Sequence, residues 1–198
     1  MKRTAIILAA LLLGVAYAAQ AQDSSSRDLP KQYSYNPFRI DVGVGLSFPV
    51  TTFGIGILGS IEPQYSFGPF AVGARVEYHI EGNENEQDGS ITKYNNAMLL
   101  TGDYRFSSGT YRPFVGAGLG SYLTAATFLA EDSYSGNDKY HVFGQKIGGM
   151  FRAGFDLPHF RFALQCNITG GDTYLGRKVN FSYLSFAIAV GIGGGRIR

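Results

Sequence analysis

The chain has 198 residues, of which 45% are apolar and 16% charged, with 27 glycines, 13 tyrosines, 15 phenylalanines and one cysteine. The formal net charge of +2 falls to 0 without Lys2 and Arg3, so charge gives no indication of nucleic-acid binding. A single cysteine excludes an internal disulfide. After the N-terminal segment, no apolar stretch reaches the ~20 residues of a membrane-spanning helix.

The N-terminus has the pattern of an export signal. Lys2 and Arg3 precede an apolar stretch over residues 5–16, and Ala19-Gln20-Ala21 follows as a small-x-small cleavage site. This predicts a signal peptide over residues 1–21, with Ala18 as the alternative cleavage position. Residues 22–36 are polar and rich in serine, and we expect them to form a periplasmic leader before a single domain over residues 37–198.

Residues 39–48 are the first of eight segments in which apolar residues alternate with polar or small ones. Successive side chains of a strand point to opposite faces, so strict alternation predicts one apolar and one polar face. Further alternating segments lie at 54–65, 70–80, 94–106, 112–125, 142–155, 160–169 and 181–191. Most of them reach the ~9–11 residues of a tilted membrane strand.

The connections between these segments alternate in length after the first. Residues 66–69, 107–110 and 157–159 predict tight turns, whereas 81–92, 127–140 and 170–180 predict longer polar loops, and 49–53 is short. A periplasmic N-terminus would place every tight turn in the periplasm and every long loop outside, as is typical of outer-membrane barrels.

No second layer of elements is predicted that could cover eight apolar faces. The sequence therefore predicts an all-β, eight-stranded antiparallel up-and-down transmembrane β-barrel, with apolar side chains toward lipid and polar side chains inward. Many glycines fall on the inward face, where they would leave room for larger side chains. Aromatic residues near both strand ends, including Phe181 and Tyr183 at the outer end, predict two belts at the membrane interfaces.

The predicted inward face carries charges of both signs. The lumen of an eight-stranded barrel is only wide enough to be filled by side chains, so these charges must pair. We expect an interior ion-pair network and negligible conductance, with His79 as a hydrogen-bonded interior residue. The network is predicted to comprise Arg39, Asp41, Glu62, Arg75, Glu77, Asp103, Arg105, Lys146, Arg152, Asp156 and Arg161.

Two segments resemble a known family. Residues 111–120, Tyr-Arg-Pro-Phe-Val-Gly-Ala-Gly-Leu-Gly, look like the Y-x-P-Y-V-G-x-G-x-G fifth-strand entry of the small eight-stranded outer-membrane barrels of the OmpX and OmpA type. Residues 183–191 are similar to the closing strand of that family. The family usually ends in an outward-facing aromatic residue, whereas this chain ends Gly195-Arg196-Ile197-Arg198, which bears on the details of assembly.

No motif predicts catalysis, a cofactor or a metal ion. The three histidines are scattered, and His141 lies near Glu131, Asp132 and Ser133 without the spacing that would identify a nucleophile. The acidic stretch 81–89 lacks the closing glutamate of a calcium loop and predicts a solvated loop. Gly116-x-Gly118-x-Gly120 is not followed by a helix, so it does not predict a nucleotide site.

The sequence thus predicts a Gram-negative cell-envelope protein that acts as a structural and surface-interaction platform. Resemblance to the family implies roles in envelope integrity, adhesion or evasion of host defence, with lipid, lipopolysaccharide, the insertion machinery and an extracellular protein or host-surface ligand as partners. Two alternatives stay open: a secreted, soluble lipocalin-like barrel with its apolar faces lining a cavity, and a barrel component of a secretion apparatus.

Overall fold

The computed structural model describes residues 36–50, 54–85, 89–129, 139–174 and 177–194; within them, residues 83–85, 89–91, 128–129, 139–142, 171–174 and 177–179 are described by backbone alone. The predicted signal peptide and all of the predicted leader except Asn36 lie outside these residues. Among the described residues, no helix is long and apolar enough to span a membrane.

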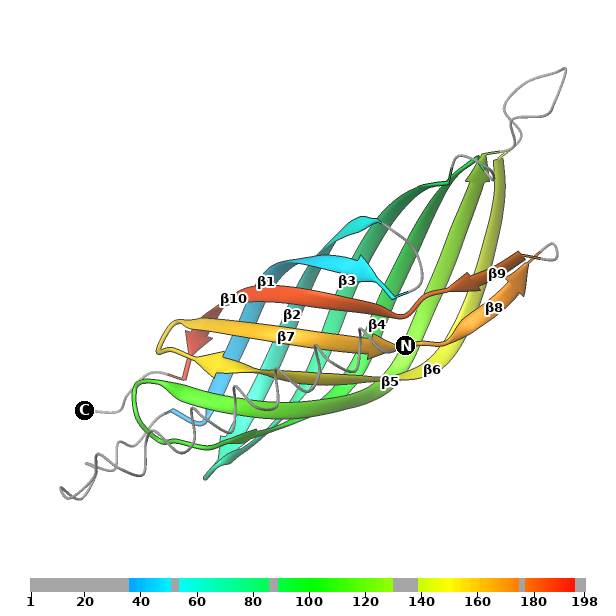
Figure 1. Cartoon of the computed structure of the whole chain (residues 1–198). Helices are drawn as coiled ribbons and strands as arrows, with labels where there is room; N and C mark the ends of the chain where they lie inside the picture. Colours follow the sequence, from blue (N-terminus) through cyan, green and yellow to red (C-terminus); the bar gives the residue numbers. More distant parts are fainter. Residues whose placement is uncertain (1–35, 51–53, 86–88, 130–138, 175–176, 195–198) are drawn as a thin grey trace, which may run out of the picture.

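Eight strands close into one antiparallel barrel (Figure 1), which confirms the predicted fold class. Along the chain they are β1 (Phe38–Pro49), β2 (Ile55–Phe67), β3 (Phe70–Asn85), β4 (Gly89–Arg105), β5 (Arg112–Leu129), β6 (Lys139–Asp156), β7 (Phe160–Ile168) and β10 (Tyr183–Gly193). A separate hairpin is formed by β8 (Gly171–Tyr174) and β9 (Arg177–Asn180).

The barrel closes between its first and last strands. β1 pairs with β10 over all but its first residue, from Arg39 opposite Gly193 to Pro49 opposite Tyr183, and pairs with β2 on its other side. Every other barrel strand pairs with the strands before and after it, as up-and-down topology requires. This closure leaves no free edge between β1 and β10 in the body of the barrel.

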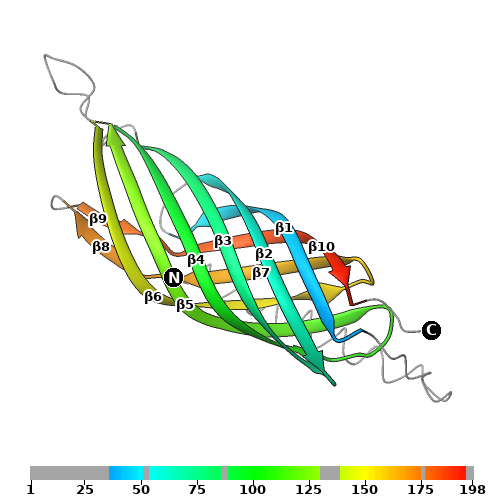
Figure 2. The same ribbon diagram turned by 180° about the vertical axis from the view of Figure 1, so that it is seen from behind.

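The two ends of the barrel differ, and we call them the turn end and the loop end. The turn end carries the connections β2–β3, β4–β5 and β6–β7, where the structure shows the predicted short turns. Gly68 has a φ of 60° in the two-residue connection between β2 and β3, a conformation that glycine adopts without steric cost. The other connections lie at the loop end, where β3 to β6 project beyond their neighbours (Figure 2).

Strand pairing continues into the predicted long loops, which corrects their expected form. β3 and β4 pair out to Asn85 opposite Gly89, and β5 and β6 pair out to Leu129 opposite Lys139. The predicted loop over residues 170–180 contains the β8–β9 hairpin. Backbone pairing does not require an apolar face, so the polar composition of these segments did not predict it.

Side chains on the barrel are sorted as predicted. Leu99 is 3% exposed, whereas its neighbour Leu100 is 75% exposed, because adjacent residues of β4 face opposite sides of the wall. The outward positions of every barrel strand carry large exposed apolar side chains, and the inward positions carry most of the buried charged and amide groups. A lipocalin-like barrel requires the reverse arrangement, so that alternative is wrong for the described residues.

Aromatic rings form part of a belt at the turn end. Phe70 lies 5.2 Å from Tyr104, which lies 5.2 Å from Phe106, and Tyr111 lies 5.1 Å from Phe155 between ring centroids. At the loop end the predicted belt is wrong for two members. Phe181, two residues before β10, and Tyr183, its first residue, are buried on the inward side, whereas Phe186 is at an outward position of β10.

Candidate functional site

The lumen contains one connected ion-pair network formed by ten of the eleven predicted residues. Five arginines and five carboxylates take part, and all of them are buried: Arg39, Arg75, Arg105, Arg152, Arg161, Asp41, Glu62, Glu77, Asp103 and Asp156. The eleventh, Lys146, is half-buried closer to the loop end, with Nζ 6.0 Å from the ring centroid of Phe181.

Arg152 is the centre of the network. Its Nη1 and Nη2 each donate to Glu62 at 2.6 Å, and its Nε and Nη2 donate to Asp103 at 2.8 and 3.0 Å. One guanidinium thus binds two carboxylates through paired hydrogen bonds, the geometry in which arginine is most effective. Because Glu62 is on β2, Asp103 on β4 and Arg152 on β6, these bonds cross the lumen.

A second branch extends from Glu62 toward the loop end. Arg75 on β3 donates through Nη1 to Glu62 at 3.1 Å and through Nε to Glu77 at 2.9 Å. The Tyr183 hydroxyl donates to the other oxygen of Glu77. Arg75 also donates to Gln165 at 3.2 Å, so β7 joins the same cluster.

A third branch extends to the turn end. Arg161 donates to Asp156 at 2.7 Å and lies 3.1 Å from Asp103, while its guanidinium carbon lies 4.4 Å from the ring centroid of Phe114. Asp156 also accepts from Arg105 at 2.9 Å. Arg39 donates from Nε to Asp41, and Asp41 lies 3.4 Å from Nε of Arg161. Together the three branches connect six strands across the lumen, namely β1, β2, β3, β4, β6 and β7.

The loop-end half of the lumen is filled by side chains of which sequence reasoning identified only His79. Its Nε2 lies 2.7 Å from the Ser47 hydroxyl, its Nδ1 lies 3.3 Å from the Asn95 amide nitrogen, and its ring stacks on Tyr183 at 4.0 Å. Tyr122 donates to Asn167 at 2.9 Å nearby. Ser47, Asn95 and Tyr122 lie at inward positions of their strands. The alternation of inward and outward residues is the only sequence feature that could have identified them.

Ser47, His79 and Asn95 have the composition of a hydrolytic triad, but their arrangement does not support that chemistry. The Asn95 amide nitrogen also donates to the Phe181 carbonyl at 3.3 Å, and as a donor toward Nδ1 it leaves Nε2 to carry the proton. A histidine in that tautomer cannot accept the serine proton as a general base. All three side chains are also at most 1% exposed.

Sequence reasoning also missed a separate ion pair. Lys93 donates to Glu81 at 3.0 Å across the β3–β4 ribbon, and both side chains are buried. Glu81 was expected in a solvated loop, and Lys93 was not singled out. Because the two residues face each other in the strand register, the extension of β3 and β4 beyond their predicted ends accounts for the error.

Glycines make room for the large inward side chains. A Cβ at Gly148 would lie 2.8 Å from the Tyr122 ring, and a Cβ at Gly191 would collide with the guanidinium of Arg39. At Gly102, which faces outward, a Cβ would meet no atom within 4 Å. The inward glycines therefore serve the packing of a narrow lumen, as the sequence predicted.

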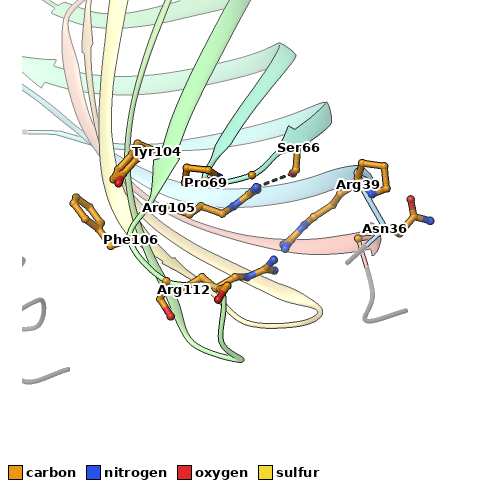
Figure 3. Close-up of a pocket in the computed structure, with 13 residues that line it drawn as sticks. Asn36, Arg39, Ser66, Pro69, Tyr104, Arg105, Phe106 and Arg112 are labelled. Carbon is orange, nitrogen blue, oxygen red and sulfur yellow. Dashed lines mark hydrogen bonds between the residues drawn. The ribbon is translucent and has the colours of Figure 1, made fainter. Parts of the chain in front are cut away.

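A cavity of about 730 Å³ opens at the turn end. Figure 3 shows Arg39 and Arg112 pointing toward each other across it, with Arg105 and Ser66 joined by a hydrogen bond of 2.7 Å at one side. Tyr104 and Phe106, from the turn-end aromatic belt, also line it.

The remaining sequence candidates lie elsewhere. Glu131, Asp132 and Ser133 are outside the described residues, and of His141 only the backbone is described. Within the described part of the chain, no group of three or more His, Cys, Asp or Glu side chains could hold a metal ion.

Comparisons with known proteins give structural matches without a sequence match. No family model and no curated protein matches this chain. Among solved structures, Neisserial surface protein A has a TM-score of 0.47 and 15% identity over 80% of this chain and 96% of its own. The N-terminal barrel of Pseudomonas aeruginosa OprF has a TM-score of 0.43 and 15% identity over 80% of this chain and 100% of its own. Yersinia pestis Ail in complex with sucrose octasulfate has a TM-score of 0.49 and 11% identity over 78% of this chain and 99% of its own.

Proposed function

We propose that this chain is an integral outer-membrane protein whose exterior contacts lipid and whose closed lumen makes it a rigid platform for the connections at the loop end. The observation that carries this proposal is the inverted distribution of side chains. A ring of exposed Val, Ile, Leu and Phe surrounds a core of buried Arg, Asp and Glu. A contiguous apolar surface of this extent is unusual on a soluble monomer, and lipid is the environment that would stabilise it.

The barrel has the dimensions that this proposal requires. Its described strands run from 9 residues in β7 to 18 in β5 and β6, against the ~9–11 needed to cross a bilayer. Closure pairs the backbone around the wall, so lipid would meet no unpaired strand edge there. Outer-membrane lipid, lipopolysaccharide and the insertion machinery are the partners that such a location implies.

Cell fractionation with heat-modifiable electrophoresis tests the location. We expect the chain, expressed in a Gram-negative host, in the outer-membrane fraction, with unboiled and boiled samples migrating differently. A protein that stays in the soluble periplasm or medium without detergent would contradict the proposal.

The ion-pair network supports a lumen that does not conduct. Arg152, Glu62 and Asp103 connect β6, β2 and β4 across its middle, so an ion passing through would have to separate charge pairs that are out of contact with water. We expect no stable conductance steps when the purified protein is added to a planar bilayer. Large, regular steps would contradict the closed lumen.

We further propose that the protein acts by surface interaction and is not an enzyme. The buried Ser47 and the amide donor at His79 support this. Adhesion, envelope integrity and evasion of host defence are the candidate roles, with an extracellular protein or host-surface ligand bound at the loop end. Exchange of the loop-end connections for those of an unrelated barrel should abolish binding to host cells and leave heat-modifiability intact; binding that survives the exchange would contradict this role.

A further inference from the structure

We propose that the β8–β9 hairpin is a hinged cover that closes onto the free edge of β6 at the loop end. β6 pairs with β7 only between Gly149 and Asp156, so residues 139–148 have β5 on one side and, among the described residues, no paired strand on the other. A free edge is a place where another chain can add a strand, and a closed hairpin would protect it. This inference does not depend on the location or the role proposed above.

The free edge of β6 presents unpaired backbone donors. The Gly144 carbonyl accepts from the Thr124 hydroxyl of β5 at 3.2 Å, so the backbone groups of Gly144 face β5. Successive residues of a strand direct these groups to opposite sides, and the N–H groups of Phe143, Gln145 and Ile147 therefore face away from β5. Ile147 and Phe143 are 90% and 78% exposed, the largest values among the described large apolar side chains, as expected where β6 has an uncovered flank.

A β-bulge at Gly170 turns the hairpin away from β6. β7 pairs with β10 as far as Asn167 opposite Tyr183. β8 pairs with β9 from Gly171 opposite Asn180. Between these two pairs the first strand has one residue more than the second, and Gly170 lies there with a φ of 74°, so the strand bends. Figure 1 shows the hairpin diverging from the end of β6, and Figure 2 shows the same divergence from behind.

The hairpin would continue the ladder between β6 and β7 if the bend at the bulge opened. That ladder ends at Gly149 opposite Ile168, and the extra residue of the bulge is passed over. The next pairs would then be Ile147 with Gly171, Lys146 with Asp172 and Gln145 with Thr173. The middle pair sets an acidic residue opposite a basic one, and opposite charges at facing positions stabilise a sheet.

The hairpin has a free edge that fits this register. Its closing pair is Tyr174 with Arg177, and the closing pair of a two-residue hairpin exchanges backbone hydrogen bonds. By the same alternation, the N–H group of Thr173 faces away from β9. Because the hairpin is tethered beside β6, its effective concentration at that edge is high, and a second copy or a separate peptide would have to compete with it.

Amide hydrogen exchange tests the cover, followed by NMR on the isotope-labelled protein in dodecyl maltoside micelles. Thr173→Pro removes the donor that faces β6 and none of those that face β9, whereas Thr173→Ala keeps it. We expect the amides of Phe143, Gln145 and Ile147 to exchange about threefold or more slowly in the intact chain and in Thr173→Ala than in Thr173→Pro. The amide of Gly144, which faces β5, should exchange alike in all three.

A second variant keeps the test decisive if Thr173→Pro disturbs the hairpin itself. Replacing residues 171–180 by the two-residue turn Asn-Gly removes the hairpin and leaves the sequence of β6 unchanged. We expect the three edge amides to exchange as fast in this variant as in Thr173→Pro. Equal exchange in the intact chain and in both variants would mean that the edge stays open, and protection that persists without the hairpin would mean that another strand covers it. Either result would overturn the proposal.

Discussion

Toward the turn end, the lumen contains ten ion-paired side chains, whereas toward the loop end it contains aromatic, amide and hydroxyl groups. Arg152 binds two carboxylates in the first region, whereas in the second Tyr122 donates to Asn167 and His79 contacts Ser47 and Asn95, all of them uncharged partners. Removing one member of a buried charge network leaves charges unpaired, whereas removing one hydrogen bond between neutral groups costs less free energy of folding. The two halves should therefore differ in their sensitivity to substitution.

Arg152→Met should produce the largest effect. It leaves Glu62 and Asp103 without their main partner, and we expect the free energy of unfolding to fall by about 3–5 kcal/mol. Urea unfolding in lipid vesicles, followed by circular dichroism, measures the change. Lys146→Met is the matched control and should cost under about 1 kcal/mol, because Lys146 is half-exposed. Equal losses in the two variants would remove the distinction between the halves.

Tyr183→Phe tests the junction between the halves. The hydroxyl of Tyr183 donates to Glu77, which keeps its contact with Arg75 in the variant. We expect a loss of about 1.5–3 kcal/mol, the range for a hydrogen bond to a charged group. The same unfolding experiment measures it, and a loss as large as that of Arg152→Met would mean that the network extends through Tyr183 into the loop-end half.

Gly148→Ala tests packing in the loop-end half. The added methyl group would lie 2.8 Å from the Tyr122 ring and 2.7 Å from the Ile168 carbonyl oxygen, so we expect a loss of about 1–3 kcal/mol. Gly102→Ala adds the same group on the outer face, with no atom within 4 Å, and should be neutral or slightly stabilising. If both variants unfold alike, the loop-end lumen is not tightly packed.

The smallest effect is expected for the isolated pair at the loop end. Replacing Glu81 and Lys93 together by leucine removes both charges, and such replacements of buried pairs are often neutral or stabilising. Lys93→Leu alone should cost more than the double variant, because it leaves Glu81 buried without its partner. A double-mutant cycle on unfolding free energies measures the difference, and additive losses would show that the pair is not coupled.

The sequence predicted the turn-end half better than the loop-end half for a physical reason. A charge at an inward strand position is conspicuous, because burial obliges it to pair, and so Arg75, Glu77 and Arg152 stood out. Ser47, Asn95 and Tyr122 are common on water-facing strands as well, and alternation alone does not show which of them interact. Which inward side chains meet across the lumen depends on the strand register and the strand tilt, and the sequence of a single strand does not determine either.

The strand ends show the same limit. Within the barrel wall, the alternation of apolar residues shows which way each residue faces, and the predicted strands match the structure to within a few positions. Beyond it, β3 and β4 continue to Asn85 and Gly89 through a polar segment. Pairing there depends on the backbone, and a polar segment gives little sign of it. Glu81 and Lys93 continue the inward positions of His79 and Asn95 but lie one residue outside the predicted strands, so they were not recognised as partners.

Quenching by brominated lipid tests most directly whether the apolar exterior faces lipid. The chain contains no tryptophan, so Leu100→Trp or Leu119→Trp places a single indole on the outer face, and Ser108→Trp places one in a turn-end connection. In bilayers with bromine in the acyl chains, we predict strong quenching at positions 100 and 119 and weak quenching at 108. Equally weak quenching at all three, or a folded protein that needs neither lipid nor detergent, would contradict the account.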